Sequence, residues 1–204
     1  MEALTVRSCD ELEGVVGWIV DEFMQRCSHA LVSEGRVWVI DPVDGDGVEE
    51  RIRAAGAPAG VIQLLDRHKR DCAGLAERLG VPHFPVPEEA VPPFEFRRIR
   101  GSRWWAEVAL WWPERRILVF ADALGTAPYF RARGERLGVH PILRLLPPRR
   151  QLAGLAPAAV LCGHGEGVLD GAEPVLHEAL SSARRRIPAQ VASAVRAWRA
   201  SRPS

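Results

Sequence analysis

Residues 64–74, LLDRHKRDCAG, place a short charged segment between an apolar run and a helical pattern. The apolar run, Gly60 to Leu65, has strand length and no polar face, as expected of a strand buried on both sides. Asp71 then begins a helix with one apolar face that stops at Gly80. The segment therefore predicts a buried strand, a polar loop and a helix, with Asp71 also suited to be the N-cap.

Two later segments repeat this arrangement of a strand followed by polar side chains. In VFADAL, residues 119–124, Asp122 follows a strand predicted over Ile117 to Ala121. In LCGHG, residues 161–165, His164 follows a strand predicted over Ala158 to Cys162. A histidine between two glycines at a strand end has no evident packing role, so this position points to chemistry.

In order and spacing, the three segments resemble the best-marked motifs of the metallo-β-lactamase superfamily. There the first motif is an apolar strand followed by His-x-His-x-Asp-His-x-x-Gly, the second is apolar-apolar-Gly-Asp-x-Leu, and the third is a strand ending in Gly-His-Gly. The turn at Ile40-Asp41-Pro42 also matches the family's Ile-Asp-x-Gly, although Pro42 and Val43 depart from it. The resemblance runs from about Ala30 to the C-terminal helices.

This resemblance implies an α/β fold, a four-layer αββα sandwich of two mixed β-sheets. We expect a single domain over 1–204, with C-terminal helices from about residue 172. The local patterns agree with this order of elements. Strands are expected at 28–32, 36–40, 83–86, 94–99 and 104–112, and helices at 48–55 and near 141–146. A further helix starts near Pro188, and its apolar stripe is expected to dock on the body of the protein. That stripe consists of Ile187, Val191, Val195 and Trp198.

Family members hold one or two metal ions, usually zinc, and the resemblance carries part of that ligand set to this chain. The aspartate that bridges the two metals falls on Asp122, the last histidine on His164, and the Asp-His pair of the first motif on Asp71 and Cys72. All four side chains are competent zinc ligands. The half-site for the second metal is therefore expected to survive with one ligand exchanged.

The first half-site is expected to be lost. Its His-x-His pair becomes Arg67 and Lys69, and its third ligand falls near 101–103, on Arg103 or Ser102. Guanidinium and ammonium groups have no lone pair to donate to a metal. His68 lies three residues before Asp71, whereas the family ligands lie two and four before. We therefore expect His68 to face solvent, and only a slip of the loop would bring it into the site.

Two functions remain open at this level. In the first, the protein hydrolyses nothing and binds a small anionic molecule or a protein partner, with Arg67, Lys69 and Arg103 as the anion-binding candidates. In the second, one zinc ion on Asp71, Cys72, Asp122 and His164 supports hydrolysis of an ester, thioester or phosphoester. The catalytic candidates are then Asp71, Arg67 and Lys69. The cofactor is accordingly either absent or a single zinc ion.

Composition excludes several other classes. The net charge of +1 provides no field that attracts nucleic acid or an anionic membrane. Nuclease members of the superfamily carry an inserted domain for which this chain has no room. No apolar stretch approaches the length of a membrane span, and the four cysteines are scattered, so a reducing cytoplasm is expected. The four tryptophans between 104 and 112 are expected to form core and groove wall rather than a base-stacking platform, and the oligomeric state is open.

Overall fold

The computed structural model describes residues 4–68 and 70–201. The first sheet contains six strands in their sequence order. They are β1 (Val6–Leu12), β2 (Val15–Val20), β3 (Cys27–Ser33), β4 (Arg36–Ile40), β5 (Ala57–Gln63) and β6 (His83–Pro85). The first four strands are antiparallel neighbours, and β4, β5 and β6 run parallel. The sheet is therefore mixed.

The second sheet has four strands in the order β12-β9-β8-β7. Their bounds are β7 (Glu95–Ser102), β8 (Trp105–Trp112), β9 (Ile117–Phe120) and β12 (Ala159–Cys162). The pair β9 and β12 is parallel, and the other two pairs are antiparallel. A short hairpin-like pair, β10 (Leu124–Gly125) and β11 (Gly138–Val139), lies beyond β9.

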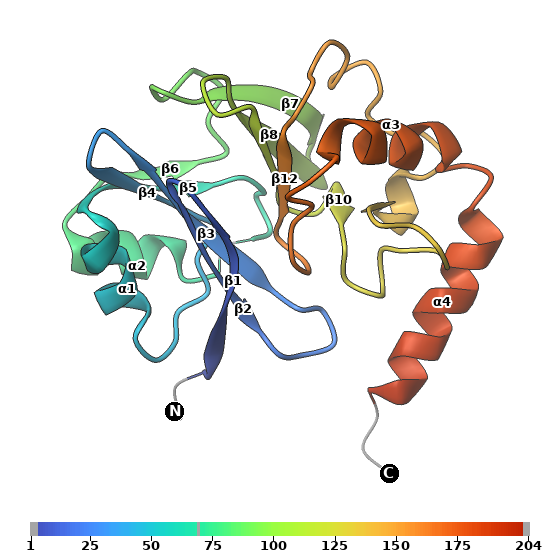
Figure 1. The fold of residues 1–204 in the computed structure, drawn as a ribbon, viewed down its shortest axis with the longest axis horizontal. Coiled ribbons are helices and arrows are strands. Elements are labelled where there is room, and N and C mark those ends of the chain that lie inside the picture. The colour runs from blue at the N-terminus through green and yellow to red at the C-terminus, as the bar shows by residue number, and fades with distance from the viewer. Residues whose placement is uncertain (1–3, 69, 202–204) are drawn as a thin grey trace.

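The helices lie on the outer faces of the two sheets (Figure 1). Helices α1 (Val48–Ala55) and α2 (Cys72–Leu79) cover the first sheet, and α3 (Ala172–Ser182) covers the second. The main core lies between the sheets and joins Leu31 and Trp38 of the first to Trp112 and Leu118 of the second. The predicted sandwich of two mixed sheets between helical layers is confirmed.

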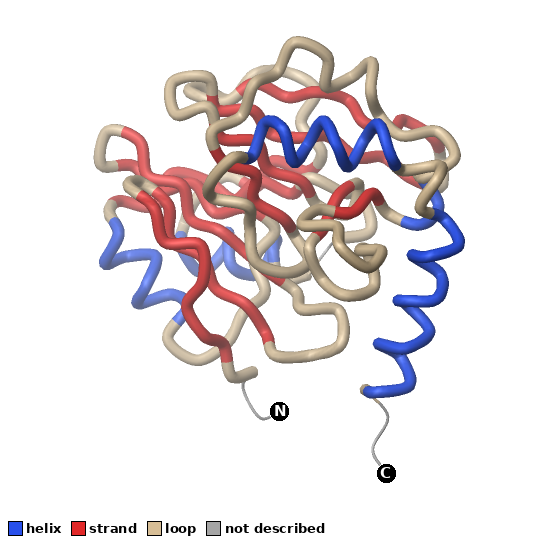
Figure 2. Tube along the Cα trace, turned by 45° about the vertical axis from the view of Figure 1, so that its right-hand side comes forward, coloured by secondary structure: helices blue, strands red, loops and turns tan. Residues whose placement is uncertain are grey.

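The last helix, α4 (Ile187–Ala200), projects from this body in both views (Figures 1 and 2). The prediction that its apolar stripe docks on the body is wrong, because Val191 and Val195 are 53% and 42% exposed and Trp198 is 47% exposed. The helix instead turns a polar residue inward. Gln190 is buried, and its side-chain amide donates a hydrogen bond to the carbonyl of Tyr129. A short 3-10 helix, η1 (Pro141–Leu143), replaces the longer helix expected near 141–146.

No helix in the described part of the chain is long and apolar enough to cross a membrane.

Candidate metal centre

Four polar side chains meet where parallel strands end. Asp41 follows β4 and His68 follows β5, while Asp122 follows β9 and His164 follows β12. Within each sheet the two strands are parallel neighbours, so their carboxyl ends lie at one edge. The two edges face each other across the sandwich. Segments far apart in the sequence therefore deliver their side chains to one place.

Three of these residues, His68, Asp122 and His164, form a compact group of potential metal ligands. Oδ1 of Asp122 lies 2.8 Å from Nε2 of His68 and 3.0 Å from Nε2 of His164. The two Nε2 atoms are 3.3 Å apart. A tetrahedral zinc ion with ligand distances of about 2.0 Å separates nitrogen and oxygen ligands by roughly 3.3 Å. The three atoms thus lie close to the corners of one face of such a site.

The protonation of His164 follows from its second ring nitrogen. Nδ1 of His164 lies 2.8 Å from the carbonyl oxygen of Met24, which can only accept a hydrogen bond. Nδ1 therefore carries the proton, and in the neutral ring Nε2 presents a lone pair to the group. Metal-binding histidines are typically oriented in this way, by donating the other N–H to a carbonyl or carboxylate.

Nδ1 of His68 faces Oδ2 of Asp41, but at 3.6 Å the two atoms lie beyond hydrogen-bond distance. Both atoms are buried and have no hydrogen-bond partner. The same holds for Oδ1 of Asp122, which faces the two imidazole rings but has hydrogen-bond geometry to neither. Buried polar atoms are rarely left in this state. A cation bound between Oδ1 of Asp122 and the two imidazole rings would provide this oxygen with a partner. The donor set and its unsatisfied atoms therefore fit one metal ion.

Charges in the group are strongly coupled. Burial alone would raise the pKa of Asp122, but its contacts with His164 and His68 outweigh burial and hold that pKa well below its usual range. Burial and Arg70 act to lower the pKa of His68, yet Asp122 and Asp41 outweigh them and raise it. Burial lowers the pKa of His164. The pKa values of Asp122 and His68 thus shift in opposite directions, as expected of a carboxylate and an imidazolium that stabilise each other.

Arg70 links the two sheets near the group through hydrogen bonds to backbone carbonyls. One guanidinium nitrogen donates to the carbonyls of Cys27 and Asp41, both at 2.8 Å, and the other donates to the carbonyl of Gly163 at 2.9 Å. Two of these carbonyls belong to the first sheet and one to the loop after β12. Hydrogen bonds from a charged donor contribute more than neutral ones. Arg70 therefore fixes the spacing between Asp41 and the loop that carries His164.

Glu107 positions Asp122 from inside the second sheet. Its side chain is completely buried, and Oε1 accepts hydrogen bonds from the backbone N–H groups of Asp122 and Ala123 at 2.9 and 2.8 Å. Oε2 accepts from the indole of Trp105 at 2.7 Å. Burial, reinforced by the charge of Asp122, raises the pKa of Glu107 to about 7. The turn after β9 is thus held by a carboxyl group that titrates near neutrality.

An aromatic wall closes one side of the group. The ring of Phe130 stacks on His164 at 5.3 Å between centroids. His140 packs edge-to-face against Phe130 and Trp105. Burial lowers the pKa of His140 to about 4, because the aromatic surroundings disfavour the imidazolium.

This shift predicts an acid-sensitive contribution from His140 to the stability of the metal-free protein. The unfolded histidine has a pKa near 6.5, so the contribution is complete above that pH and is lost as the pH falls toward 4. Between pH 7.5 and pH 4.5 the loss amounts to about 2 to 3 kcal/mol. Urea denaturation of chelator-treated protein at both pH values measures it. In His140→Asn, which keeps an acceptor for the N–H of Ile142, the pH dependence should shrink by that amount. An unchanged pH dependence would refute the assignment.

The structure separates the four metal ligands expected from the sequence. Asp122 and His164 lie in the group, whereas Asp71 and Cys72 are not members of it. Oδ2 of Asp71 accepts a hydrogen bond from the backbone N–H of Asp44 at 2.8 Å, and the side chain makes no capping bond to α2. Cys72 is buried in the core under the first sheet, and burial raises the pKa of its thiol.

The cationic residues expected around the site stack on tryptophans. The guanidinium of Arg67 lies 4.5 Å from the ring centre of Trp105, and that of Arg103 lies 4.1 Å from Trp104. Arg103 and Trp104 form the turn between β7 and β8, whereas Arg67 reaches Trp105 from the loop after β5. Trp104 is 70% exposed, unlike the buried tryptophans of β8. Lys69 lies outside the described residues.

The expectation that His68 faces solvent is wrong, since its side chain is only 11% exposed and points into the group. The motifs in the sequence also did not point to Arg70, Glu107 or His140. Glu107 carries a detectable signal, because it is the only charged residue in the otherwise apolar strand β8. Arg70 carries none, because its partners are backbone carbonyls from three distant segments.

Comparisons with known proteins agree on the fold. Solved structures of metallo-β-lactamases superimpose on nearly the whole chain. DIM-1 metallo-β-lactamase matches with a TM-score of 0.59 at 14% identity, covering 90% of this chain and 99% of its own. A metallo-β-lactamase from Erythrobacter litoralis gives 0.59 at 11% identity, covering 91% and 95%. FIM-1 from Pseudomonas aeruginosa, in a mono-zinc form, gives 0.56 at 11% identity, covering 100% and 99%.

No protein-family model and no curated protein sequence matches the chain. The similarity is therefore one of fold, and what the site does has to be argued from its own residues.

Proposed function

We propose that this chain, which has the metallo-β-lactamase fold, is a hydrolase that works with a single zinc ion bound by His68, Asp122 and His164. The observation that carries the proposal is the convergence of two Nε2 atoms and one carboxylate oxygen within 3.3 Å of one another. Three protein ligands with one position left for water or substrate are typical of catalytic zinc sites. FIM-1, which shares the fold, is described in a mono-zinc form, and this supports a one-metal site.

The proposed ligand set differs from the one that the family motif suggested. His68 takes the place that the motif gave to Asp71 and Cys72. Two neighbours support this exchange. The carboxylate of Asp41 faces Nδ1 of His68, and the carbonyl of Met24 accepts a hydrogen bond from Nδ1 of His164. Such outer partners fix the ring orientation of metal-binding histidines.

A zinc ion in such a site polarises a carbonyl or phosphoryl group and makes water acidic enough to attack it near neutral pH. The residues of the chain supply the orientation. Glu107 fixes the backbone of Asp122, and Phe130 and Trp105 limit access of water from one side. Arg67, held over Trp105, offers a positive charge to an anionic substrate or to the oxyanion that develops during attack. Esters, thioesters and phosphoesters are the substrate classes that this chemistry suits.

Metal content and hydrolysis, measured together, test the proposal. We expect His68→Ala to hold one zinc ion fewer per chain than the unmodified protein and to lose hydrolysis in an ester, thioester and phosphoester screen. Cys72→Ala is the matched control, because the family motif names it as a ligand while the structure leaves it in the core. It should keep both zinc and activity. Equal zinc content in His68→Ala and the unmodified protein, or zinc loss in Cys72→Ala alone, would refute the proposed ligand set.

A metal-free anion-binding role is the second candidate. It is supported by the 2.8 Å contact between Asp122 and His68 and by the guanidinium of Arg67 over Trp105, whose ring packs on His140. Thermal-shift measurements in the presence of a chelator separate the two roles. Stabilisation by carboxylates or phosphates that persists with chelator, and is lost in Arg67→Ala, would favour anion binding over hydrolysis.

A further inference from the structure

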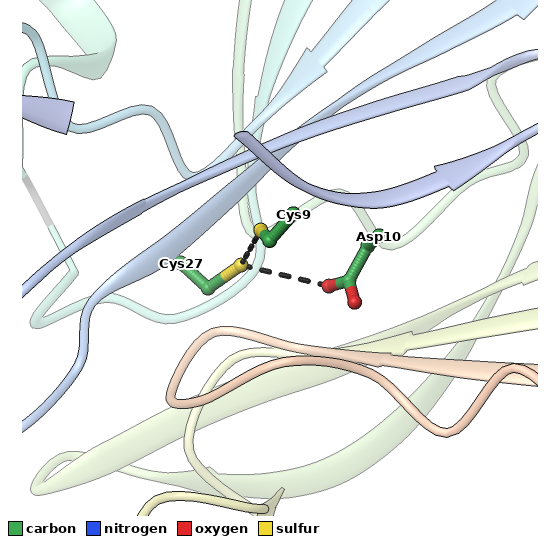
Figure 3. Close-up of side chains that lie close together, drawn as sticks. All are labelled: Cys9, Asp10 and Cys27. Carbon is green, nitrogen blue, oxygen red and sulfur yellow. Dashed lines mark hydrogen bonds between the residues drawn. The ribbon is translucent and has the colours of Figure 1, made fainter. Parts of the chain in front are cut away.

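A second group of metal-ligand side chains lies in the first sheet, away from His68, Asp122 and His164. Cys9 and Asp10 come from β1, and Cys27 and His29 from β3. All four are buried, and the side chains of Asp10 and His29 are each only 2% exposed. Figure 3 shows the two sulfur atoms and the carboxylate of Asp10 turned toward one another. Two thiols, a carboxylate and an imidazole are the side chains that zinc prefers.

The backbone is specifically shaped to bring these side chains together. In a regular strand, consecutive side chains point to opposite faces, yet Cys9 and Asp10 are both buried. A register shift between Cys9 and Leu12 and a left-handed φ of 49° at Asp10 turn both side chains inward. Left-handed backbone is uncommon for a residue other than glycine, and such strain concentrates at functional positions.

The neighbouring strand leaves room for the group. Gly17 of β2 lies in register between Cys9 and His29, so the position between them carries no side chain. A Cβ added at Gly17 would lie 2.5 Å from the carbonyl oxygen of Cys9 and 3.1 Å from Cβ of Asp10. Side chains from β1 and β3 can therefore extend toward each other over a glycine.

The distances resemble those between the ligands of one tetrahedral metal. Sγ of Cys27 lies 3.2 Å from Sγ of Cys9, 3.5 Å from Nε2 of His29 and 3.7 Å from Oδ2 of Asp10. Nε2 of His29 lies 2.9 Å from Oδ2 of Asp10. Ligand distances of about 2.3 Å for sulfur and 2.0 Å for nitrogen and oxygen predict separations of roughly 3.3 to 3.8 Å. The ligand atoms of Cys9, Asp10 and Cys27 lie within 4.8 Å of one another, and His29 meets this group through Asp10 and Cys27. An ion on all four side chains therefore requires His29 and Cys9 to move closer together.

A disulfide between Cys9 and Cys27 accounts for the group less well. Strand β2 lies between β1 and β3, so two strand spacings, about 9 to 10 Å in a flat sheet, separate the two backbones. Disulfides span Cα atoms up to about 7 Å apart. A metal between the sulfur atoms bridges a longer gap.

We propose that Cys9, Asp10, Cys27 and His29 bind a structural zinc ion. Full burial and four protein ligands suit a structural rather than a catalytic site. The group also contacts the loop that carries His164. Oδ1 of Asp10 accepts a hydrogen bond from the N–H of Gly167 at 2.7 Å, and the N–H of Cys27 donates to the carbonyl of Gly163 at 2.9 Å. Zinc here would tie both ends of that loop to the first sheet, whether or not the protein is a hydrolase.

Cobalt(II) titration tests this site independently of the other one. The titration uses reduced, chelator-treated His164→Ala protein, in which the histidine site is disabled. Cobalt bound to cysteine thiolates gives a charge-transfer absorption in the near ultraviolet, and ligands limited to histidine and aspartate do not. We expect one equivalent of cobalt to produce this band, Cys27→Ala to abolish it and Cys72→Ala to retain it.

Native mass spectrometry of the same His164→Ala protein gives a second readout that needs no cysteine variant. One zinc ion retained after desalting supports the site. Absence of both the cobalt band and bound zinc would overturn the proposal, and so would a band that persists in Cys27→Ala. An intact mass lower by two hydrogens in protein prepared without reductant, with no metal bound after reduction, would overturn it in favour of a disulfide.

Discussion

Replacing Asp122 by asparagine is expected to lower zinc affinity at the histidine site by more than about 100-fold and to abolish hydrolysis. Loss of an outer hydrogen-bond partner typically reduces metal affinity by about 10- to 100-fold, and loss of a charged direct ligand should exceed that. Oδ1 of Asp122 is the atom that both imidazoles face. The asparagine keeps the shape of the side chain and the backbone N–H that Glu107 holds. The change therefore removes charge while the turn stays in place.

Asp71→Asn is the matched control for this prediction. It also replaces an aspartate that the family motif names as a ligand, but in the structure this carboxylate accepts a hydrogen bond from Asp44. We expect zinc affinity within a few-fold of that of the unmodified protein. Competition with a chromophoric chelator measures both variants, and circular dichroism verifies folding. Retention of zinc and turnover in Asp122→Asn, with loss in Asp71→Asn, would restore the ligand set suggested by the motif.

Elements with a clear periodic pattern could be predicted from the sequence. The hairpin that became β3 and β4, the short helix α1 and the helix α2 with its terminal Gly80 all lie within a few residues of their expected bounds. The first two strands were missed. In β1 the bulge after Cys9 breaks the alternation of polar and apolar residues that marks a strand. The two cysteines that meet across β2 therefore appeared scattered.

The site was partly predictable for a related reason. Asp122 and His164 each lie two residues after a strand, close enough for the strand end to fix the position of the side chain. His68 follows a turn, because its N–H bonds to the carbonyl of Leu65, and Arg70 has a left-handed φ of 37°. The prediction for His68 relied on alternate residues before Asp71 pointing to the same side. This holds for an extended chain, and this loop is not extended. The residue that the parity argument excluded is therefore the one that enters the group.

The apolar stripe of α4 shows the limit of periodicity in the other direction. A stripe at helical spacing predicts a buried face, yet Val191 and Val195 are exposed while Gln190 is buried against the 3-10 segment and Tyr129. The hydrogen bond from Gln190 to a backbone carbonyl fixes which side of the helix faces the body. Periodicity identifies an apolar face, but the fold determines whether that face is covered.

The largest change in stability is expected from replacing Arg144 by methionine. Arg144 is fully buried, and its guanidinium holds Glu135 through two hydrogen bonds of 3.1 and 2.6 Å. It also donates to the carbonyl of Phe130 at 2.7 Å and to that of Ala183 at 3.4 Å. Without Arg144, the buried carboxylate of Glu135 keeps only the N–H of Ala132 at 2.6 Å and Nε of Arg186 at 3.8 Å among the partners that the described residues offer. The free energy of unfolding should fall by about 3 to 5 kcal/mol in urea denaturation.

Two further variants test whether the loss of stability in Arg144→Met depends on the burial of its ion pair. Arg97→Met removes the partner of Glu95 from a pair whose side chains are 40% and 45% exposed, and should cost no more than about 1 kcal/mol. The double variant Arg144→Met with Glu135→Leu removes both buried charges and should recover much of the lost stability. Equal losses in Arg144→Met and Arg97→Met would contradict the argument. Because Arg144 also holds the carbonyl of Phe130, whose ring stacks on His164, the buried pair links the stability of this region to the geometry of the metal centre.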